Sequence, residues 1–196
     1  MTSRQAWKHS LCSALLMGAL FTQTAVAAPV LEIVATPDPA RVGSPLGLDV
    51  MLTGITDLYG YQFSLPFDPT LLQAIAVTEG PFPATGGSTF FDGGSIDNVL
   101  GTISFVFDTL VGPGPGVTGS GLLEHVSFSA THAGSSALTF ADVLFLDSNL
   151  NGIEVLAQAR DLRIIAATAV PEPETFALLA VGLAALAARR RRKSVR

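Results

Sequence analysis

The sequence predicts an all-β domain, built as two antiparallel sheets packed face to face, within a chain of 196 residues. Three observations support this prediction. Apolar residues alternate with polar or small ones with a period of two, which is typical of strands that bury one face. The apolar segments are short and are separated by Gly, Pro, Asn and Asp. No amphipathic helix of ordinary length interrupts them, so a βαβ order is not expected.

The clearest alternation occupies residues 46–52 and 59–67, where every second side chain is leucine, valine, tyrosine or phenylalanine. One turn of helix is expected just after it, because Asp68 can cap backbone amides and Pro69 suits the first helical position. The Gly-Pro repeat at residues 112–116 is expected to be a long hairpin loop. Further strands, giving about nine in all, are expected at residues 31–35, 72–78, 102–107, 122–130, 137–146, 153–157 and 162–166.

Residues 1–27 are expected to be a secretory signal peptide. Two cations precede an apolar run, and Ala25 and Ala27 supply the small residues that signal peptidase needs. The only cysteine, Cys12, lies inside this segment, so residues 28–169 are expected to fold as one domain without a disulfide or a cysteine-bound metal. From residue 28 to residue 170 there are 14 Asp or Glu against three Arg, a net charge of about −11, which disfavours nucleic acid as a partner.

Residues 170–196 combine a Pro-Glu-Pro break, an apolar stretch and a basic cluster. The apolar stretch has 13 residues and spans roughly 20 Å as a helix, whereas a hydrocarbon core is about 30 Å thick. We therefore expect a short, weakly held transmembrane helix whose basic end stays in the cytoplasm. The break is expected at Val170, Pro171, Glu172 and Pro173, the anchor at Phe176, Leu178, Leu179, Val181, Leu183 and Leu186, and the positive end at Arg189, Arg190, Arg191, Arg192 and Lys193.

Three stretches, FSLPFDPTLLQAIAVTEGPF (63–82), GTISFVF (101–107) and GLLEHVSFSATHAGSSALTFADVLFLDSNLNGIEV (121–155), together resemble the cohesin family. This resemblance covers about residues 30–166 and implies a nine-stranded jelly-roll β-sandwich, in agreement with the strand pattern. Cohesins bind dockerins, which are calcium-folded pairs of helices, through one face of the sandwich. The resemblance therefore implies a non-catalytic protein-interaction module with a dockerin-like partner.

The tail, residues 170–196, is similar to the PEP-CTERM sorting signal of Gram-negative bacteria, which joins the Val-Pro-Glu-Pro break to a short apolar helix and an arginine cluster. In that family a membrane-embedded exosortase recognises and cuts the tail. The resemblance implies that the exported chain is held briefly at the inner membrane. Processing by an exosortase-type enzyme then releases it to the cell surface or the extracellular matrix.

One segment, residues 147–152, has two interpretations. Asp147, Asn149 and Asn151 match the first half of a calcium loop, which suggests a weak Ca²⁺ site. The position of the bidentate glutamate is Gln158, however, and strands rather than helices are expected on each side. A hairpin turn explains the same residues, because Asn-Gly is the favoured pair at the centre of a type I′ turn. No other cofactor is expected.

No catalytic residues are expected. His125 lies on a predicted strand and His132 in the following turn, and the sequence offers them no cysteine nucleophile and no serine in a nucleophile-elbow motif. The preferred function is a non-catalytic interaction or structural domain at the cell surface. The alternative is a module that binds extracellular polysaccharide, since carbohydrate-binding sandwiches share this architecture. Such a module needs exposed aromatic side chains, and the candidates are Tyr59, Tyr61, Phe82, Phe90 and Phe91.

Overall fold

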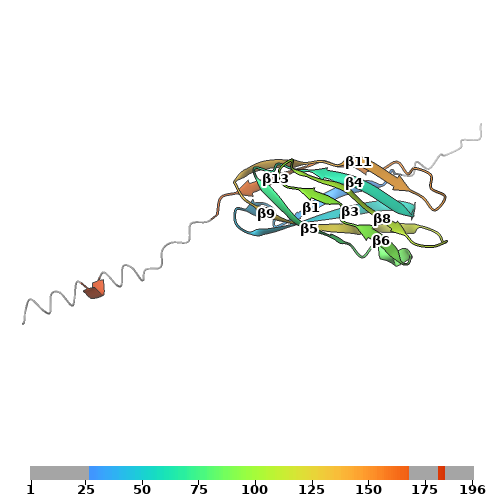
Figure 1. The fold of residues 1–196 in the computed structure, drawn as a ribbon, viewed down its shortest axis with the longest axis horizontal. Coiled ribbons are helices and arrows are strands. Elements are labelled where there is room, and N and C mark those ends of the chain that lie inside the picture. The colour runs from blue at the N-terminus through green and yellow to red at the C-terminus, as the bar shows by residue number, and fades with distance from the viewer. Residues whose placement is uncertain (1–26, 168–180, 184–196) are drawn as a thin grey trace, which may run out of the picture.

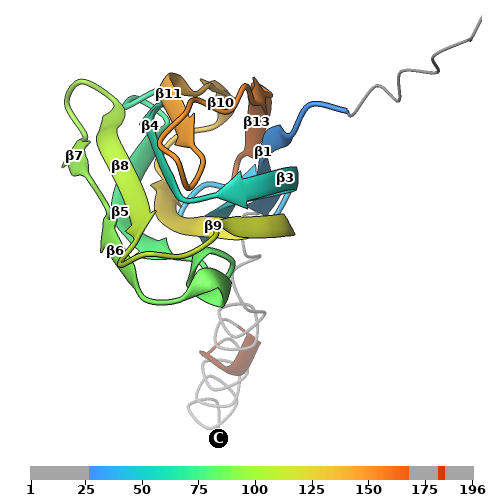
Figure 2. The ribbon, with the colours of Figure 1, turned by 90° about the vertical axis from the view of Figure 1, so that its right-hand side faces the viewer.

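The computed structural model describes residues 27–167 and 181–183, and the first of these ranges is a β-sandwich (Figure 1). Viewed end-on in Figure 2, the strands enclose a common interior. The all-β class predicted from the alternation is therefore confirmed. The structure contains more strands than the nine expected, several of which have only two to four residues. Two expected strands are longer than predicted, because β3 and β9 have 14 residues each.

Two five-stranded sheets form the sandwich. The first, here called the β3–β9 sheet, contains β12 (Leu156–Ala157), β1 (Val30–Thr36), β3 (Pro45–Leu58), β9 (Val117–Ala130) and β5 (Leu72–Glu79), in that order. The second, here called the β4–β8 sheet, contains β11 (Ala141–Leu146), β4 (Gly60–Pro66), β8 (Thr102–Leu110) and β6 (Thr89–Asp92), with β7 (Ser95–Asp97) also paired to β8. A small third sheet contains β10 (Gly134–Leu138), β13 (Arg160–Ile165) and β2 (Ala40–Arg41).

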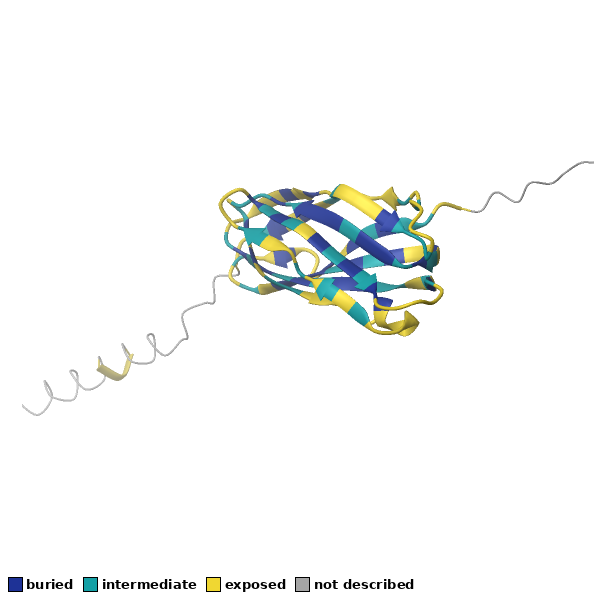
Figure 3. Cartoon of the chain, turned by 45° about the vertical axis from the view of Figure 1, so that its right-hand side comes forward, coloured by how far each residue is buried: buried dark blue, intermediate teal, exposed yellow. Residues whose placement is uncertain are grey.

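The core lies between the two large sheets, and buried and exposed residues alternate along many strands (Figure 3). On β3 the leucines and valine of residues 46–52 are at most 2% exposed, as their alternation predicts. The largest fully buried side chains are Phe63, Phe128 and Phe145, which come from both sheets. Phe128 packs edge-on against Phe67 with ring centroids 5.1 Å apart. Burial of this aromatic and aliphatic set is the main stabilising term for the sandwich.

One expected strand and one expected loop are wrong. The expected strand at residues 137–146 is interrupted after Leu138, and its halves join different sheets as β10 and β11. The Gly-Pro loop at residues 112–116 is not a hairpin loop, because it joins β8 of one large sheet to β9 of the other. A local pattern cannot reveal this difference, since a hairpin and a crossing between sheets both require turn residues.

The expected helical turn after β4 is a single hydrogen-bonded turn. Leu71 and Leu72 donate their amides to the carbonyl oxygen of Asp68, at 3.1 and 3.0 Å. The Asp68 carboxylate accepts the amide of Thr70 at 2.8 Å, which is the predicted capping role. The short 3₁₀ helix η1 (Pro83–Gly86) lies in the connection between β5 and β6, where no element was expected.

Candidate functional site

The outer face of the β4–β8 sheet carries a hollow above Gly60. Gly60 lines this hollow and is paired with Leu146 on β11 and Thr109 on β8. The hollow has about 420 Å³ of empty space, including open solvent at its mouth. Its outward-facing walls are formed mainly by Leu144, Leu146, Phe107 and Thr109, with Gln62 at one end. A concave, largely apolar surface of this kind is suited to receive a side chain of a partner.

Two phenylalanines extend this hollow toward the edge of the sheet. Phe90 on β6 and Phe107 on β8 lie with ring centroids 5.9 Å apart and planes tilted by 44°. Phe90 is 59% exposed, and Leu144 on the other side of the hollow is 45% exposed. The β4–β8 sheet therefore presents a continuous apolar strip from β11 to β6, here called the apolar face.

A third phenylalanine is held outward by a strained backbone. Phe105 has φ of 54°, in the left-handed region, and is 58% exposed. It lies where β8 has one residue more than β4 between paired positions, which makes this site a β-bulge. Positive φ is a genuine outlier for a bulky side chain, and strained positions of this kind cluster at functional sites.

Ser64 connects this bulge to a second one on the opposite side of β4. Its hydroxyl accepts the amide of Phe105 at 3.2 Å and donates to the carboxylate of Asp142 at 3.0 Å. Asp142 also has positive φ, at 53°, and lies in a bulge of β11. One buried serine therefore holds two strained positions, which present Phe105 and Val143 beside the apolar face.

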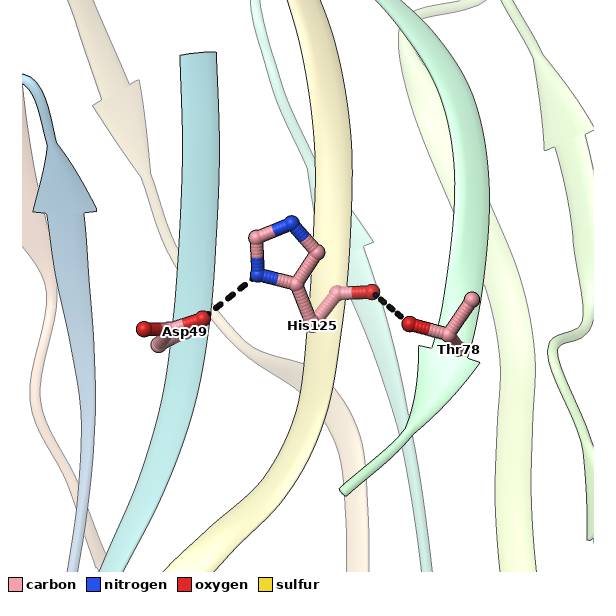
Figure 4. Close-up of polar contacts among 3 residues, drawn as sticks. All are labelled: Asp49, Thr78 and His125. Atoms are coloured by element: carbon pink, nitrogen blue, oxygen red, sulfur yellow. Dashed lines mark hydrogen bonds and ion pairs between the residues drawn. The ribbon is translucent and has the colours of Figure 1, made fainter.

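The outer face of the β3–β9 sheet carries a polar pair on its central strands, although Val34 on β1 and Ile75 on β5 of the same sheet are also exposed. His125 on β9 lies between Asp49 on β3 and Thr78 on β5 (Figure 4). Its Nδ1 is 2.6 Å from a carboxylate oxygen of Asp49, and its carbonyl oxygen accepts the Thr78 hydroxyl at 3.3 Å. His132 contacts the carbonyl oxygen of Thr70 at 2.9 Å. Both histidines make surface contacts, and the described residues bring neither of them beside a serine nucleophile.

The segment suggested as a calcium loop is a turn stabilised by its own side chains. Asp147 Oδ1 accepts the amides of Asn149 and Asn151, both at 2.8 Å, and the Asn151 side chain donates to Oδ2 at 3.1 Å. These hydrogen bonds, led by the Asn151 side chain, lower the pKa of Asp147. The left-handed residue is Leu150, with φ of 63°, and not the Asn-Gly pair that suggested a type I′ turn. Within the described residues no cluster of three metal-ligating His, Cys, Asp or Glu side chains forms.

Most of the aromatic side chains considered for sugar binding are not well exposed to solvent. Tyr61 is 4% exposed and Phe82 is 8% exposed, because both point into the core. Tyr59 and Phe91 are half-buried against that core. Phe90 is the one candidate of the five that is well exposed. The sequence did not identify Phe107, which packs beside it, or the exposed Phe105.

Several sequence-based expectations fall on residues outside the described ranges. These are the signal segment apart from Ala27, the sorting motif from Val170 to Pro173, and the tail on either side of residues 181–183. Val181 and Leu183 belong to a helical stretch and are exposed. Within the ranges that the structure describes, no helix has the length and apolar character needed to span a bilayer.

Comparison with known proteins finds two family matches. Residues 31–160 match the model of the cohesin domain, and residues 169–192 match the PEP-CTERM protein-sorting motif. Among curated proteins, no relative matches the chain.

Solved cohesins share the fold at low sequence identity. A non-cellulosomal cohesin from Archaeoglobus fulgidus aligns with a TM-score of 0.56 and 19% identity, over 71% of this chain and 92% of its own. The second type II cohesin module of the adaptor ScaA scaffoldin of Acetivibrio cellulolyticus aligns with a TM-score of 0.59 and 19% identity, over 76% and 97%. A type I cohesin–dockerin complex of Clostridium thermocellum, Coh-OlpA–Doc918, aligns with a TM-score of 0.55 and 17% identity, over 69% and 99%.

Proposed function

The chain belongs to the cohesin domain family, and on this premise we propose that residues 28–169 are an interaction module that binds a dockerin-like protein through the apolar face. Together with the sorting motif, this membership supports an exported cell-surface protein. Several solved cohesins that resemble the chain, including one from Clostridium thermocellum, are described in complexes with dockerins. The observation that carries the proposal is the contrast between the two outer faces of the sandwich.

Among the described residues, the β4–β8 sheet is the one whose exposed side chains include phenylalanines. The apolar face combines exposed phenylalanines with the hollow above Gly60, whereas the opposite face carries the exposed Asp49–His125 pair. Interfaces obtain most of their affinity from a few aromatic or large apolar residues that fit into pockets. An exposed polar pair such as Asp49–His125 contributes little by comparison.

The charges around the apolar face indicate the chemistry of the partner. Asp92 and Asp142 are both exposed, on β6 and β11 respectively, and flank the face on its two sides. Opposite charges at the rim of an interface speed association and select the correct partner. We therefore expect the partner to present an apolar centre, formed by helices in the case of a dockerin, surrounded by lysine or arginine.

In this proposal the tail directs the chain to the cell surface. Residues 170–196 act as a PEP-CTERM sorting signal that holds the exported chain at the inner membrane until an exosortase-type enzyme cuts it. The match to the sorting-motif model at residues 169–192 supports this step. A reporter fused to residues 170–196 should lose the tail and appear outside a Gram-negative host that has the enzyme. Accumulation of uncut fusion in the inner membrane of that host would contradict it.

The experiment that tests the binding function is a pull-down with the exported chain as bait. Dockerin-bearing proteins and extracellular polysaccharide from the same cells are offered separately, with calcium and with a chelator. We expect retention of a dockerin-bearing protein that is lost with the chelator, because the resemblance implies that dockerins fold around calcium. Retention of polysaccharide alone, unaffected by the chelator, would instead support the carbohydrate-binding alternative.

A further inference from the structure

Two carboxyl groups from opposite sheets are buried inside the sandwich. Asp108 on β8 is 1% exposed and Glu124 on β9 is 0% exposed. Within the described residues, no protein group has good hydrogen-bond geometry to any of their four carboxyl oxygens, although the Thr109 amide and the Tyr61 hydroxyl lie near enough to influence them. Carboxyl groups are almost never fully buried without a partner, because an ionised carboxylate strongly prefers water. This pair therefore requires a physical explanation that the docking of a partner does not supply.

The groups facing the pair are acidic or neutral. Tyr61 on β4 is paired directly with Asp108 and donates its hydroxyl to the carbonyl oxygen of Leu123 at 3.3 Å. Glu79, at the end of β5, is paired with Glu124 and accepts the hydroxyl of Thr89 at 2.7 Å. On β6, Phe91 is the residue paired with Asp108. These neighbours leave the buried pair without a counter-charge.

The cations of the described residues all lie elsewhere. The ring of His125 is on the outer face against Asp49, and His132 contacts the carbonyl oxygen of Thr70. The three arginines lie on the small third sheet, Arg41 on β2 and Arg160 and Arg163 on β13. With no cation available, ionisation of either buried carboxyl would leave an uncompensated charge in the core.

Proton binding is the way in which such groups avoid this cost. Burial raises the pKa of Asp108 to about 7, and the nearby Glu79 adds to this rise. Burial also raises the pKa of Glu124 to about 8, against the opposite effect of the Tyr61 hydroxyl and with a further contribution from Asp108. The two groups titrate as a coupled pair, since the first charge to form opposes the second.

The connection between β5 and β6, residues 80–88, covers the edge of the sandwich beside this pair and is here called the strap. The Gly80 and Phe82 amides donate to the carbonyl oxygens of Leu123 and Leu122 at 2.7 and 3.2 Å. Its Pro83 lines a pocket that is also lined by Tyr61 and Asp108. The strap therefore binds to the backbone immediately before Glu124, and its Pro83 lines the same pocket as Asp108.

We propose that Asp108 and Glu124 form an interior proton-binding site that keeps the strap closed while at least one carboxyl is protonated and loosens it when both release their protons to water. The paired charges then repel each other and attract water into the pocket beneath Pro83. The strap is the element that opens, because backbone hydrogen bonds at a sheet edge open more readily than those of the central β3–β9 pairing. This inference does not depend on which partner binds the apolar face.

Hydrogen exchange of the whole chain in a mild non-ionic detergent tests the proposal. Exchange of peptides covering residues 80–92 is measured by mass spectrometry at pH 5, 7 and 9 and corrected for the intrinsic pH dependence of amide exchange. We expect the corrected rate to rise about tenfold or more between pH 5 and pH 9. Peptides from the central part of β3 should change much less.

The double variant D108N/E124Q removes both titrating groups while preserving their shapes. Its strap should exchange slowly at every pH, whereas the control E154Q, at an exposed position, should behave as the wild type. If the double variant does not fold, carboxyl-carbon NMR of the wild type reads the titration directly. Carboxyl signals of Asp108 and Glu124 that titrate below about pH 5 would overturn the proposal, as would pH-independent exchange of the wild-type strap.

Discussion

Ser148 donates both its hydroxyl, at 2.7 Å, and its backbone amide, at 3.3 Å, to one carboxylate oxygen of Asp57. The other oxygen of Asp57 accepts the amide of Gly116 at 2.6 Å. A single side chain at the end of β3 thus ties together the loop after β8 and the turn after β11. Asp57 has positive φ, at 59°, which aspartate tolerates better than most residues.

The hydrogen bonds that Asp57 accepts predict a specific loss of stability on acidification. The Ser148 hydroxyl, followed by the Gly116 amide, lowers the pKa of Asp57 below its ordinary value of 3.8. A carboxyl with a lowered folded-state pKa contributes stability above its unfolded pKa, and that contribution disappears as pH falls through the folded value. The variant D57N should melt at a lower temperature than the wild type at pH 6, and the difference should shrink below pH 3.8. Thermal melts followed by circular dichroism measure this, with D161N at an exposed site as the control.

The buried pair predicts the opposite dependence at higher pH. Asp108 and Glu124 have folded-state pKa values of about 7 and 8, above their ordinary values of 3.8 and 4.5. Their contribution is fully present below the ordinary values and is lost as pH rises toward the folded values. The free energy of unfolding should therefore fall between pH 5 and pH 8 by the order of a few kcal/mol. Urea denaturation at the two pH values measures the fall, and an unchanged or higher stability at pH 8 would contradict the assignment.

The strained backbone of Phe105 predicts that a substitution there can weaken binding without lowering stability. Glycine accepts positive φ without strain, so F105G should be at least as stable as the wild type and up to about 1 kcal/mol more so. It should nevertheless bind the partner less well, because an exposed aromatic anchor is lost. Chemical denaturation and a binding titration on the same preparations test both parts. A destabilised F105G that binds normally would show that the residue serves packing alone.

The internal hydrogen bonds of Asp147 predict little response to calcium. A site of millimolar affinity would raise the melting temperature of the domain by a few degrees in about 10 mM CaCl₂. We expect a shift below about 1 °C, since the oxygens of Asp147 already accept three donors from the turn. The D147N variant serves as a matched control. A calcium-dependent shift that is present in the wild type and absent in D147N would restore the metal interpretation.

The alternation of apolar residues on β3 and β4 is enough to predict those strands and their buried faces. It fails on β8, where Ile103, Phe105 and Phe107 are spaced as if they shared one face. The bulge at Phe105 shifts the register, so that Val106 and Asp108 point inward and both phenylalanines point outward. A shift of one residue moves every following side chain to the other face of a sheet. The sequence contains no turn residue at this position that would announce the bulge.

Pairing between distant strands explains why the proposed docking surface was not predicted. Phe107 and Leu144 were expected only as members of strands at residues 102–107 and 137–146, and Tyr61 was a candidate for an exposed aromatic side chain. Which sheet face meets solvent depends on pairings between strands that are far apart in the chain, such as Tyr61 with Asp108. Local patterns carry no information about such pairs. The buried carboxyl pair was missed for the same reason, since Asp108 and Glu124 meet only when the two sheets pack.

The most direct test of the account is the affinity of the exported chain for the dockerin-bearing protein that it retains, compared between L144E and I75E. Leu144 is 45% exposed on the apolar face, and Ile75 is 62% exposed on β5 of the other sheet, so the two variants add the same charge at comparable surface positions. We expect L144E to bind at least about tenfold more weakly than the wild type and I75E to bind as the wild type does. Wild-type affinity in L144E together with a loss in I75E would contradict docking through the apolar face.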